Sequence, residues 1–425
     1  MRIRRWKKPR APSNSQAGTA FPKIYLIVGG DPRGTHVGSV FLRDLLCDYP
    51  REKLTRYALI RQVPRMSEEE SSWMDFTLRI RNHPTEIPKG KWVNQYTRPW
   101  ISLFTFIRYR FRQAPQLAQK ILHDAVRDKP DSIWVILNSP FLICLAKCLT
   151  GQSSVPVVVS VWDPPEKFTV DLSMPRMAAE WMLRDFKYAV QHSRRLATAS
   201  PGMQKEYLRR YSKPSHVLIH GFSRRLWRQP ITQPHKKNEL LIGFAGSLYA
   251  GREWQALLET LDMKGWVISG RKVKLRILSG SAVIRSSSPR AHIEYLGWRG
   301  LEEAVRLLSS VDIAYLPYWL EEKYRIATTL CFPNKLSVYT AAGIPVFYHG
   351  PADGSPGVFL QEYPMGVGCP SLNIQDIGGM LERYAADTGF YRSAAEAINR
   401  ARREVLNREV FVNQFSEFIG MESVS

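Results

Sequence analysis

Lys335 is the residue whose type and position most clearly predict a binding function. It lies in the segment FPNKLSVYTAAGIPV at residues 332–346, two positions after Pro333, which can open a helix. Gly343 can close the same helix in the left-handed conformation, and an apolar strand follows it. Lys335 would then stand in the first helical turn, where free backbone N–H groups and the helix dipole attract anions. The spacing predicts a phosphate-binding cation in an α/β domain.

Two glycine-containing turns follow apolar runs and could bring the backbone close to a ligand. The run KIYLIV at 23–28 leads into a turn that contains Gly29, Gly30 and Gly34, and a helical pattern follows. This turn lacks the G-x-G-x-x-G spacing of a dinucleotide fingerprint, so NAD is not indicated. A plain tight turn remains an alternative interpretation.

The second such turn follows the run LLIGFA at 240–245. It begins with Gly246 and Ser247, and Arg252 comes five positions later. Gly246, Ser247 and Arg252 are candidate site residues of this turn. Arg252 as a solvated loop charge is the alternative.

Asp163 is a further candidate, because it follows the run VPVVVSVW that ends at Trp162. Residues 155–161 have the β-branched content of a buried parallel strand, and Asp163 would lie at its carboxyl end. Ligands of doubly wound sheets bind at that end of the strands. An Asp there can accept a hydrogen bond from a hydroxyl or assist a proton transfer, and it can equally cap a helix before Pro164.

Two sets of α/β elements would position these residues. At 425 residues the chain suits two domains of roughly 200 residues each. Strand-like runs alternate with helical patterns in both halves, around a stretch rich in Pro and polar residues. We expect a basic tail over 1–20, an N-terminal Rossmann-like domain over 21–228, a linker over 229–238, a C-terminal Rossmann-like domain over 239–395 and returning helices over 396–425. Residues 62–95 are expected to be irregular.

The segment at 332–346 resembles the Pro-x-Lys-Leu-x-Glu-Tyr-x-Ala-x-Gly-x-Pro-Val motif of the retaining GT-B glycosyltransferases, the group 1 or family 4-like enzymes that use nucleotide-sugars. The matching residues are Pro333, Lys335, Leu336, Tyr339, Ala341, Gly343, Pro345 and Val346. The motif's Glu, which usually holds the donor ribose, is Val338 here. Trp162 stands where many members have a His before Asp163.

The resemblance implies two doubly wound domains that face a cleft, with a UDP- or GDP-linked sugar donor bound to the C-terminal one. It implies catalytic roles for Asp163, Arg252 and Lys335. It implies donor or acceptor contacts from Gly29, Gly30, Gly34, Gly246, Ser247, Tyr295, Pro333, Asn334, Ser337 and Tyr339. For Tyr295, a position in a core strand is the alternative that we favour. Transfer would retain the anomeric configuration without a metal ion or bound cofactor, since the leaving phosphate can take the acceptor proton.

The formal net charge of +22 predicts attraction to anionic partners. Nucleic acid, an anionic membrane and a phosphorylated substrate could each fit. The cations are spread over the chain without a helix-turn-helix, zinc or RNA-binding signature, which argues against nucleic acid. Val338 and Trp162 keep a second hypothesis open, a GT-B protein that binds a nucleotide-sugar or glycan without transferring it.

The segment Trp100–Arg112 is a candidate membrane-binding element. Its aromatic and aliphatic residues alternate with Arg108, Arg110 and Arg112, which suits an anionic lipid interface and suits equally a core helix with a solvated basic side. No signal peptide and no membrane span are evident. The five scattered cysteines are expected to be buried thiols in a reducing compartment. We therefore expect a cytoplasmic protein, peripheral at the inner face of the membrane, with a lipid-linked or polysaccharide acceptor.

Overall fold

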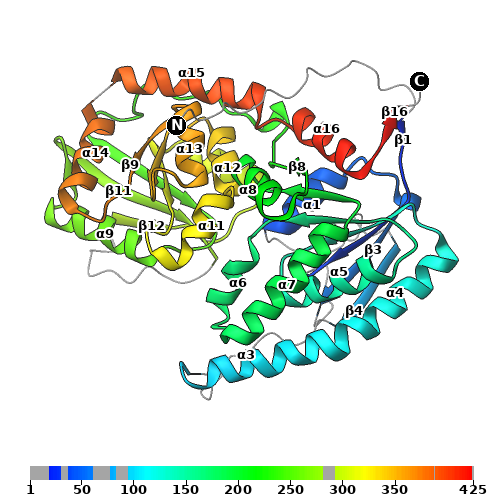
Figure 1. The fold of residues 1–425 in the computed structure, drawn as a ribbon. Helices are drawn as coiled ribbons and strands as arrows, with labels where there is room; N and C mark the ends of the chain where they lie inside the picture. Colours follow the sequence, from blue (N-terminus) through cyan, green and yellow to red (C-terminus); the bar gives the residue numbers. More distant parts are fainter. Residues whose placement is uncertain are drawn as a thin grey trace. The chain divides into compact units, whose positions relative to one another are not determined.

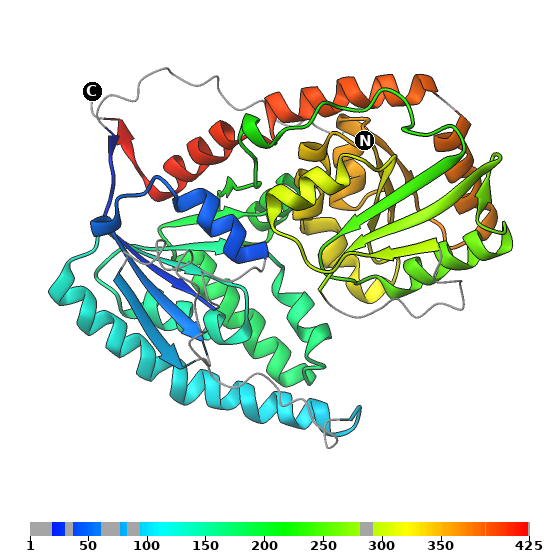
Figure 2. The same ribbon diagram turned by 180° about the vertical axis from the view of Figure 1, so that it is seen from behind.

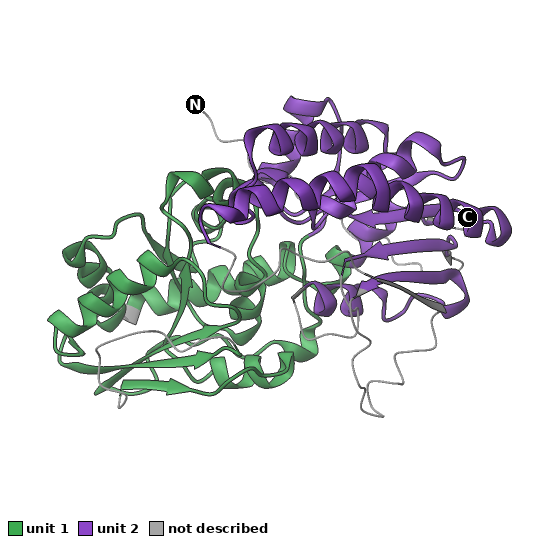
Figure 3. Cartoon of the chain, turned by 90° about the horizontal axis from the view of Figure 1, so that it is seen from below, with its two compact units in different colours: residues 1–12, 219–411 green, residues 13–218, 412–425 purple. Residues whose placement is uncertain are grey.

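The computed structural model describes residues 19–29, 37–60, 77–82, 94–280, 292–386 and 388–423. The described chain divides into two compact units (Figure 3). Unit 1 comprises residues 219–411, and unit 2 comprises the residues up to 218 together with those from 412 onward. The sequence had suggested a linker at 229–238 and a return of the chain from residue 396.

Unit 2 is built on a parallel sheet (Figure 1). Its strands, in spatial order, are β4 (Thr77–Asn82), β3 (Leu54–Ile60), β2 (Ile24–Val28), β5 (Ser132–Ile136), β6 (Val157–Val161), β7 (Arg195–Thr198) and β8 (His216–Val217). All neighbouring pairs run parallel, beginning with Ile24 opposite Leu54 between β2 and β3. The order reverses between β2 and β5, so this unit is a doubly wound, Rossmann-like fold.

The helices of unit 2 cover both faces of this sheet (Figures 1 and 2). They are α1 (Val37–Leu46), α3 (Thr97–Arg108), a π-helical turn (Tyr109–Gln113), α4 (Ala114–Asp128), α5 (Pro140–Gln152), α6 (Pro165–Asp171), α7 (Arg176–His192), α8 (Pro201–Tyr211) and α16 (Arg408–Ile419), with a 3₁₀ turn at Arg51–Lys53. Tyr25 donates a hydrogen bond to Asp128 of α4 on one face. On the other face Trp134 packs against Phe415 of α16, with ring centroids 5.2 Å apart. The last helix thus completes the core of unit 2, and β1 (Thr19–Ala20) pairs antiparallel with β16 (Glu422–Ser423).

Unit 1 has a second, predominantly parallel sheet. In spatial order its strands are β10 (Val267–Ile268), β11 (Arg271–Leu278), β9 (Glu239–Ala245), β13 (Ile313–Pro317), β14 (Val346–His349) and β15 (Gly366–Cys369), while β12 (Ile293–Tyr295) also pairs with β11. Only β10 among these strands runs antiparallel to its neighbour. The order reverses between β9 and β13, so this unit is also doubly wound.

The helices of unit 1 are α9 (Gly251–Met263), α10 (Leu301–Leu308), α11 (Arg325–Leu330), α12 (Asn334–Ala342), α13 (Ser355–Glu362), α14 (Ile374–Ala386) and α15 (Thr388–Glu404), with 3₁₀ turns at Arg224–Leu226 and Glu322–Tyr324. Helices α9 and α14 bury Trp254, Leu257 and Leu381 against one face of the sheet. Helix α15 is fixed by Arg402, whose guanidinium donates to the carbonyls of Thr340, Ala341 and Arg228.

Most of the expected elements are present, and two expectations were wrong. Strand β4 lies inside the stretch 62–95 that was expected to be irregular, because Leu78 and Ile80 alternate with arginines in the period of a strand. Cys47 is exposed, whereas the other four cysteines are buried, and all five are free thiols. Within the described part of the chain, no helix combines the length and the apolar character that crossing a bilayer requires.

Candidate functional site

The helix that carries Lys335 forms as its sequence predicts. Pro333 precedes α12 in an extended conformation, and Gly343 ends the helix with φ of 76°. A side chain at Gly343 would also meet the backbone of Gln229 and Pro230, 2.9 Å away. The two residues fix where the helix begins and ends, and Lys335 therefore lies in its first turn.

The order of the unit 1 sheet shows which strand ends lie beside this helix. The chain leaves β9 toward β11 on one side, and it later returns to place β13 on the other side. In such a sheet the ligand crevice lies at the carboxyl ends of the strands where the order reverses. Gly246 follows β9 and Tyr318 follows β13, so both lie at that edge.

Tyr339 ties α12 to this edge. Its side chain is fully buried, and its hydroxyl donates to the carbonyl of Tyr315 at 3.0 Å and accepts from the amide of Ala245 at 3.3 Å. Burial raises the pKa of Tyr339, so the hydroxyl stays protonated. Tyr339 therefore holds the ends of β9 and β13 together, and its own side chain has no exposed surface that a ligand could contact.

Lys335 reaches the turn after β9. A Cβ built on Gly246 would lie 3.2 Å from Lys335 Cε and 3.3 Å from its Nζ, and Gly246 has φ of +101°. The ammonium lies 4.3 Å from the ring centroid of Tyr249 and 5.2 Å from that of Phe244. The positive φ favours glycine here, and a side chain at this position would also push the end of Lys335 away from the turn.

The electrostatic state of Lys335 marks it as a site for an anion. Among the residues that the structure describes, no hydrogen bond or ion pair engages its ammonium, and its partners are aromatic faces. Burial lowers its pKa from the usual 10.5 to about 7. A desolvated cation without a carboxylate partner gains more from an arriving anion than a solvated surface lysine does.

Three aromatic side chains form a stack beside Lys335. Trp319 stacks on Tyr249 with centroids 4.8 Å apart, and Tyr324 stacks on Trp319 at 4.7 Å. We name this set the Tyr249–Trp319–Tyr324 stack. It joins the turn after β9 to the segment after β13, which are about 70 positions apart in the chain, so sequence reasoning missed it. The aromatic residues that follow the apolar run DIAYLP were the available signal.

Glu253 is a second residue that sequence reasoning missed. It lies in the first turn of α9 with no exposed surface, and its Oε1 accepts a hydrogen bond from the amide of Leu320 at 2.7 Å. Its Oε2 is buried without a hydrogen-bond partner in the described chain. Burial raises the pKa of its carboxyl group. Glu253 therefore holds the segment after β13, which carries Trp319.

A hydrogen-bonded histidine supports the same region. His349 Nε2 lies 2.7 Å from the carbonyl of Ser371, and its Nδ1 lies 2.9 Å from the hydroxyl of Tyr315. Burial lowers the pKa of His349 to about 4, so the ring is neutral at pH 7. Nε2 then carries the proton that bonds Ser371, and the one proton of the Tyr315 hydroxyl is shared between His349 Nδ1 and the carbonyl of Glu253, 3.0 Å away.

The remaining predicted residues of unit 1 occupy different environments. Asn334 Oδ1 lies 3.0 Å from Nδ1 of the buried His220, which anchors the start of α12. Ser337 is buried, and its hydroxyl has no hydrogen-bond partner in the described chain. Ser247 and Arg252 are exposed at the turn and in the first turn of α9, and Tyr295 is exposed at the end of β12. Pro333 is buried.

The Gly246 amide differs from the expectation that it faces a ligand. It donates to the carbonyl of Leu278 at 2.9 Å, because the turn after β9 closes against the end of β11. The contribution of Gly246 is therefore the space that it leaves for Lys335.

In unit 2, Asp163 lies at the carboxyl end of β6 as predicted. Its Oδ2 is 3.9 Å from Nζ of Lys167, and the side chain is partly exposed. The neighbouring Trp162 packs against Phe41, with ring centroids 5.3 Å apart, and its ring would meet a Cβ on Gly38 at 2.5 Å. Trp162 thus fills the space beside the start of α1. Gly29 follows β2 at the point where the strand order reverses, while Gly30 and Gly34 lie outside the described residues.

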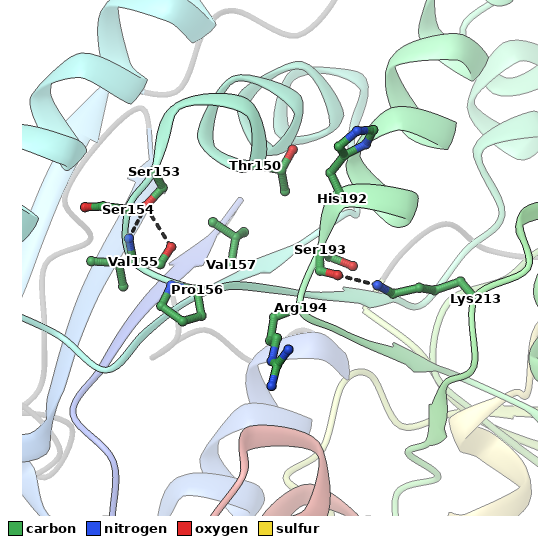
Figure 4. A pocket seen from close by; sticks show the side chains of 10 residues that line it. All are labelled: Thr150, Ser153, Ser154, Val155, Pro156, Val157, His192, Ser193, Arg194 and Lys213. Atoms are coloured by element: carbon green, nitrogen blue, oxygen red, sulfur yellow. Dashed lines mark hydrogen bonds between the residues drawn. The ribbon is translucent and has the colours of Figure 1, made fainter.

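A surface cavity of about 370 Å³ lies at the opposite, amino-terminal edge of the unit 2 sheet (Figure 4). Residues before β6 and β7 line it, including Pro156 and Arg194. Lys213 donates to the carbonyl of Ser193 there and so caps the end of α7. This lysine is already engaged by backbone, in contrast to Lys335. In the described ranges, no three His, Cys, Asp or Glu side chains gather as a metal site would require.

Comparison with solved structures identifies the fold. Sucrose-phosphate synthase from Thermosynechococcus elongatus superposes with a TM-score of 0.64 at 13% identity, over 93% of this chain and 98% of its own. Anabaena HepE in complex with UDP and glucose has the same TM-score and identity, over 94% of this chain and 100% of its own. The chain has the GT-B fold.

A third GT-B structure, WaaG, a glycosyltransferase involved in lipopolysaccharide biosynthesis, has a TM-score of 0.57 at 11% identity, over 93% of this chain and all of its own. No protein-family model and no curated protein matches the chain by sequence. The structural likeness thus rests on architecture, and the chemistry has to be argued from the residues of this chain.

Proposed function

We propose that this protein is a glycosyltransferase that moves a sugar from a UDP- or GDP-linked donor to a glycan acceptor, with retention of configuration and without a metal ion. The observation that carries the proposal is the ammonium of Lys335, which is desolvated and lies against Gly246 at the switch point of unit 1. A nucleoside diphosphate supplies the anion that this cation lacks.

The chemistry of transfer explains why such a cation matters. Breaking the anomeric bond places negative charge on the diphosphate leaving group, and a fixed cation that faces this charge lowers the barrier, commonly by several kcal/mol. Lys335 meets the requirement because α12 and the Tyr249 ring hold its side chain in place before a ligand arrives. Arg252, exposed in the first turn of α9, is proposed to supply a second cation.

The acceptor and the site on unit 2 form the finer part of the proposal. Asp163 at the end of β6 is proposed to accept a hydrogen bond from the acceptor hydroxyl, which the leaving phosphate deprotonates. Gly29 is proposed to let the backbone approach the acceptor. That the two units face a common cleft stays a prediction.

Solved structures of the same fold support the choice of donor. HepE was solved with UDP and glucose, and a trehalose-phosphate synthase from Burkholderia xenovorans is described as UDP-forming. We propose a lipid-linked or polysaccharide acceptor, reached at the cytoplasmic face of a membrane, and WaaG shows that the fold serves lipopolysaccharide biosynthesis in another protein.

A non-catalytic GT-B protein that binds a nucleotide-sugar is the second candidate. Two substitutions favour it, Val338 in place of the motif's Glu and Trp162 in place of the usual His. The Trp162 ring fills its place against Gly38 and Phe41, so it is part of the packing of unit 2 and has no group for proton transfer.

Thermal unfolding with a panel of nucleotides tests the proposal. The wild-type protein is measured with UDP, GDP, ADP, CMP and dTDP and with their common sugar conjugates. We expect one nucleotide family to raise the melting temperature, because a ligand that binds the folded state stabilises it. The shift should vanish in Lys335→Ala and persist in Lys272→Ala, an exposed lysine on β11.

The outcomes separate the two candidates. If no nucleotide changes the melting temperature, both the donor site and the transferase are wrong. If one does, the matching nucleotide-sugar is incubated with the protein and glycan acceptors, and the release of free nucleoside diphosphate is followed. Release that Lys335→Ala abolishes supports the transferase, and binding without release favours the non-catalytic protein.

A further inference from the structure

Helix α3 of unit 2 and the residues at its two ends carry exposed aromatic side chains that the proposed sugar chemistry does not use. Tyr96, Trp100, Phe104 and Phe111 expose 76%, 63%, 66% and 60% of their surface, although large aromatic side chains are usually buried. Trp100 and Phe104 lie one turn apart on α3, about 40° from each other around the helix. Tyr96 precedes the helix, and Phe111 lies in the following π-helical turn, where its ring centroid is 6.1 Å from that of Trp181 on α7. We name these four residues the aromatic stripe.

The opposite side of α3 is fixed to unit 2, so the stripe is held in place. Leu103 and Phe106 are buried, and Ser102 donates to the carbonyl of Leu172 at 2.5 Å. The guanidinium of Arg98 donates to the carbonyl of Asp171 at 2.5 Å. The helix is therefore not free to turn its aromatic side chains inward.

A π-helical turn at Tyr109–Gln113 joins α3 to α4 without a break (Figure 1). Within it Arg110 turns inward and forms a two-point ion pair with the buried Asp185 of α7, at 2.7 and 3.1 Å. Arg108 and Arg112, on either side of Arg110 in the sequence, are exposed. A π-helical turn of this kind often marks a functional element.

The charge around the stripe shows what kind of surface it fits. Residues 94–123 contain no Asp or Glu, while they contain four arginines and one lysine. Aromatic side chains suit the headgroup level of a bilayer, and arginines suit lipid phosphates. A protein partner of ordinary composition offers charges of both signs in similar numbers, whereas an anionic bilayer has a net negative surface potential.

We propose that α3 lies on the surface of an anionic bilayer, with the aromatic stripe inserted at headgroup depth and Arg108 and Arg112 on lipid phosphates. Binding of this kind needs no membrane-spanning helix, and none of the described helices is long and apolar enough to be one. This inference rests on the proposed function in one respect, that the bilayer is the place where the enzyme reaches its acceptor. Lipid binding itself does not depend on the Lys335 site.

Vesicle co-sedimentation of the full chain tests the proposal. Vesicles of phosphatidylcholine alone are compared with vesicles that contain 30% phosphatidylserine or phosphatidylglycerol. We expect binding to the anionic vesicles only, with a loss at high salt. The double variant Trp100→Ser/Phe104→Ser should bind at least tenfold more weakly, while Val126→Ser/Met263→Ser, two exposed apolar side chains elsewhere, should bind normally.

A variant with reversed charges tests the role of the arginines independently. Arg108→Glu/Arg112→Glu should weaken binding by more than twentyfold, since each basic residue contributes about fivefold at an anionic surface. The control Lys205→Glu/Lys272→Glu makes the same change of net charge at exposed positions on α8 and β11. Equal losses in the two charge variants would show bulk attraction only and would overturn the proposal.

Two further outcomes decide between this inference and its competitors. If the wild type does not bind anionic vesicles, the proposal is wrong. It is also wrong if sedimentation velocity shows a dimer that Trp100→Ser/Phe104→Ser dissociates while vesicle binding is unchanged. Lys335→Ala should bind vesicles like the wild type, so failure of the donor site and failure of the membrane surface remain distinguishable.

Discussion

The clearest quantitative consequence of the structure is that nucleotide binding should depend on pH through Lys335. The free protein holds this lysine with a pKa of about 7, and a bound diphosphate should return the pKa toward or above its ordinary value. The charged form binds the diphosphate, so above pH 7 each pH unit should cost up to about tenfold in affinity. Between pH 7 and pH 8.5 the expected loss is roughly fifteenfold.

Isothermal titration calorimetry measures this directly. A nucleoside diphosphate is titrated into the protein from pH 7 upward, where its terminal phosphate, with a pKa of about 6, is mostly ionised. Repeating the titration at pH 8.5 in buffers of different ionisation enthalpy counts protons. We expect the uptake of close to one proton per nucleotide, because the free lysine is mostly neutral at that pH and the bound lysine is charged.

Two variants separate Lys335 from other titrating groups. Lys335→Arg keeps a cation that does not titrate in this range, so its affinity should be nearly independent of pH. Lys335→Met should bind weakly at every pH and take up no proton. A wild-type affinity that stays constant from pH 7 to pH 8.5, with no proton uptake, would refute the assignment of this ammonium to the diphosphate.

Four further predictions, at three residues, concern stability and space in unit 1. Lys335→Met should be more stable than the wild type at pH 6, on the order of 1–2 kcal/mol by urea unfolding, and the gain should fade between about pH 7 and pH 10 because the wild-type lysine then loses its buried charge. Glu253→Gln should be at least as stable as the wild type at pH 7, because the raised pKa of Glu253 means that its buried carboxylate destabilises the folded protein at that pH. Any gain should disappear near pH 4, below the ordinary carboxyl pKa of 4.5, where Glu253 is protonated in both states. Glu253→Ala should lose about 1–3 kcal/mol by leaving the Leu320 amide unpaired. Gly246→Ala should weaken nucleotide binding at least tenfold and cost about 1–2 kcal/mol for its positive φ, whereas Gly251→Ala, with open space around it, should bind normally; equal affinities would exclude the proposed role of Gly246.

The two doubly wound units and the helix at α12 could be predicted because their signals are local. Pro333 and Gly343 bound the helix, and the apolar runs of β2, β5 and β6 are continuous, as expected of strands buried on both faces. Strand β4 was missed because its alternation is short and rich in charge. The π-helical turn could not be predicted either, since its residues suit an α-helix equally well.

The candidate site could be predicted only in part, because a sequence pattern does not say which side of a helix faces a ligand. Lys335 lies in the first turn of α12 as expected, yet Tyr339 from the same motif is buried and bridges two strand ends. The Tyr249–Trp319–Tyr324 stack depends on β9 and β13 being neighbours, which follows from the sheet order and not from any short segment.

A crystal structure with the nucleoside diphosphate that gives the largest thermal shift would show whether Lys335 binds the diphosphate. We expect the diphosphate to lie at the amino end of α12, with a phosphate oxygen within hydrogen-bond distance of Lys335 Nζ and the ammonium drawn away from the Tyr249 ring. A nucleotide bound elsewhere, with Lys335 still on that ring, would contradict the account.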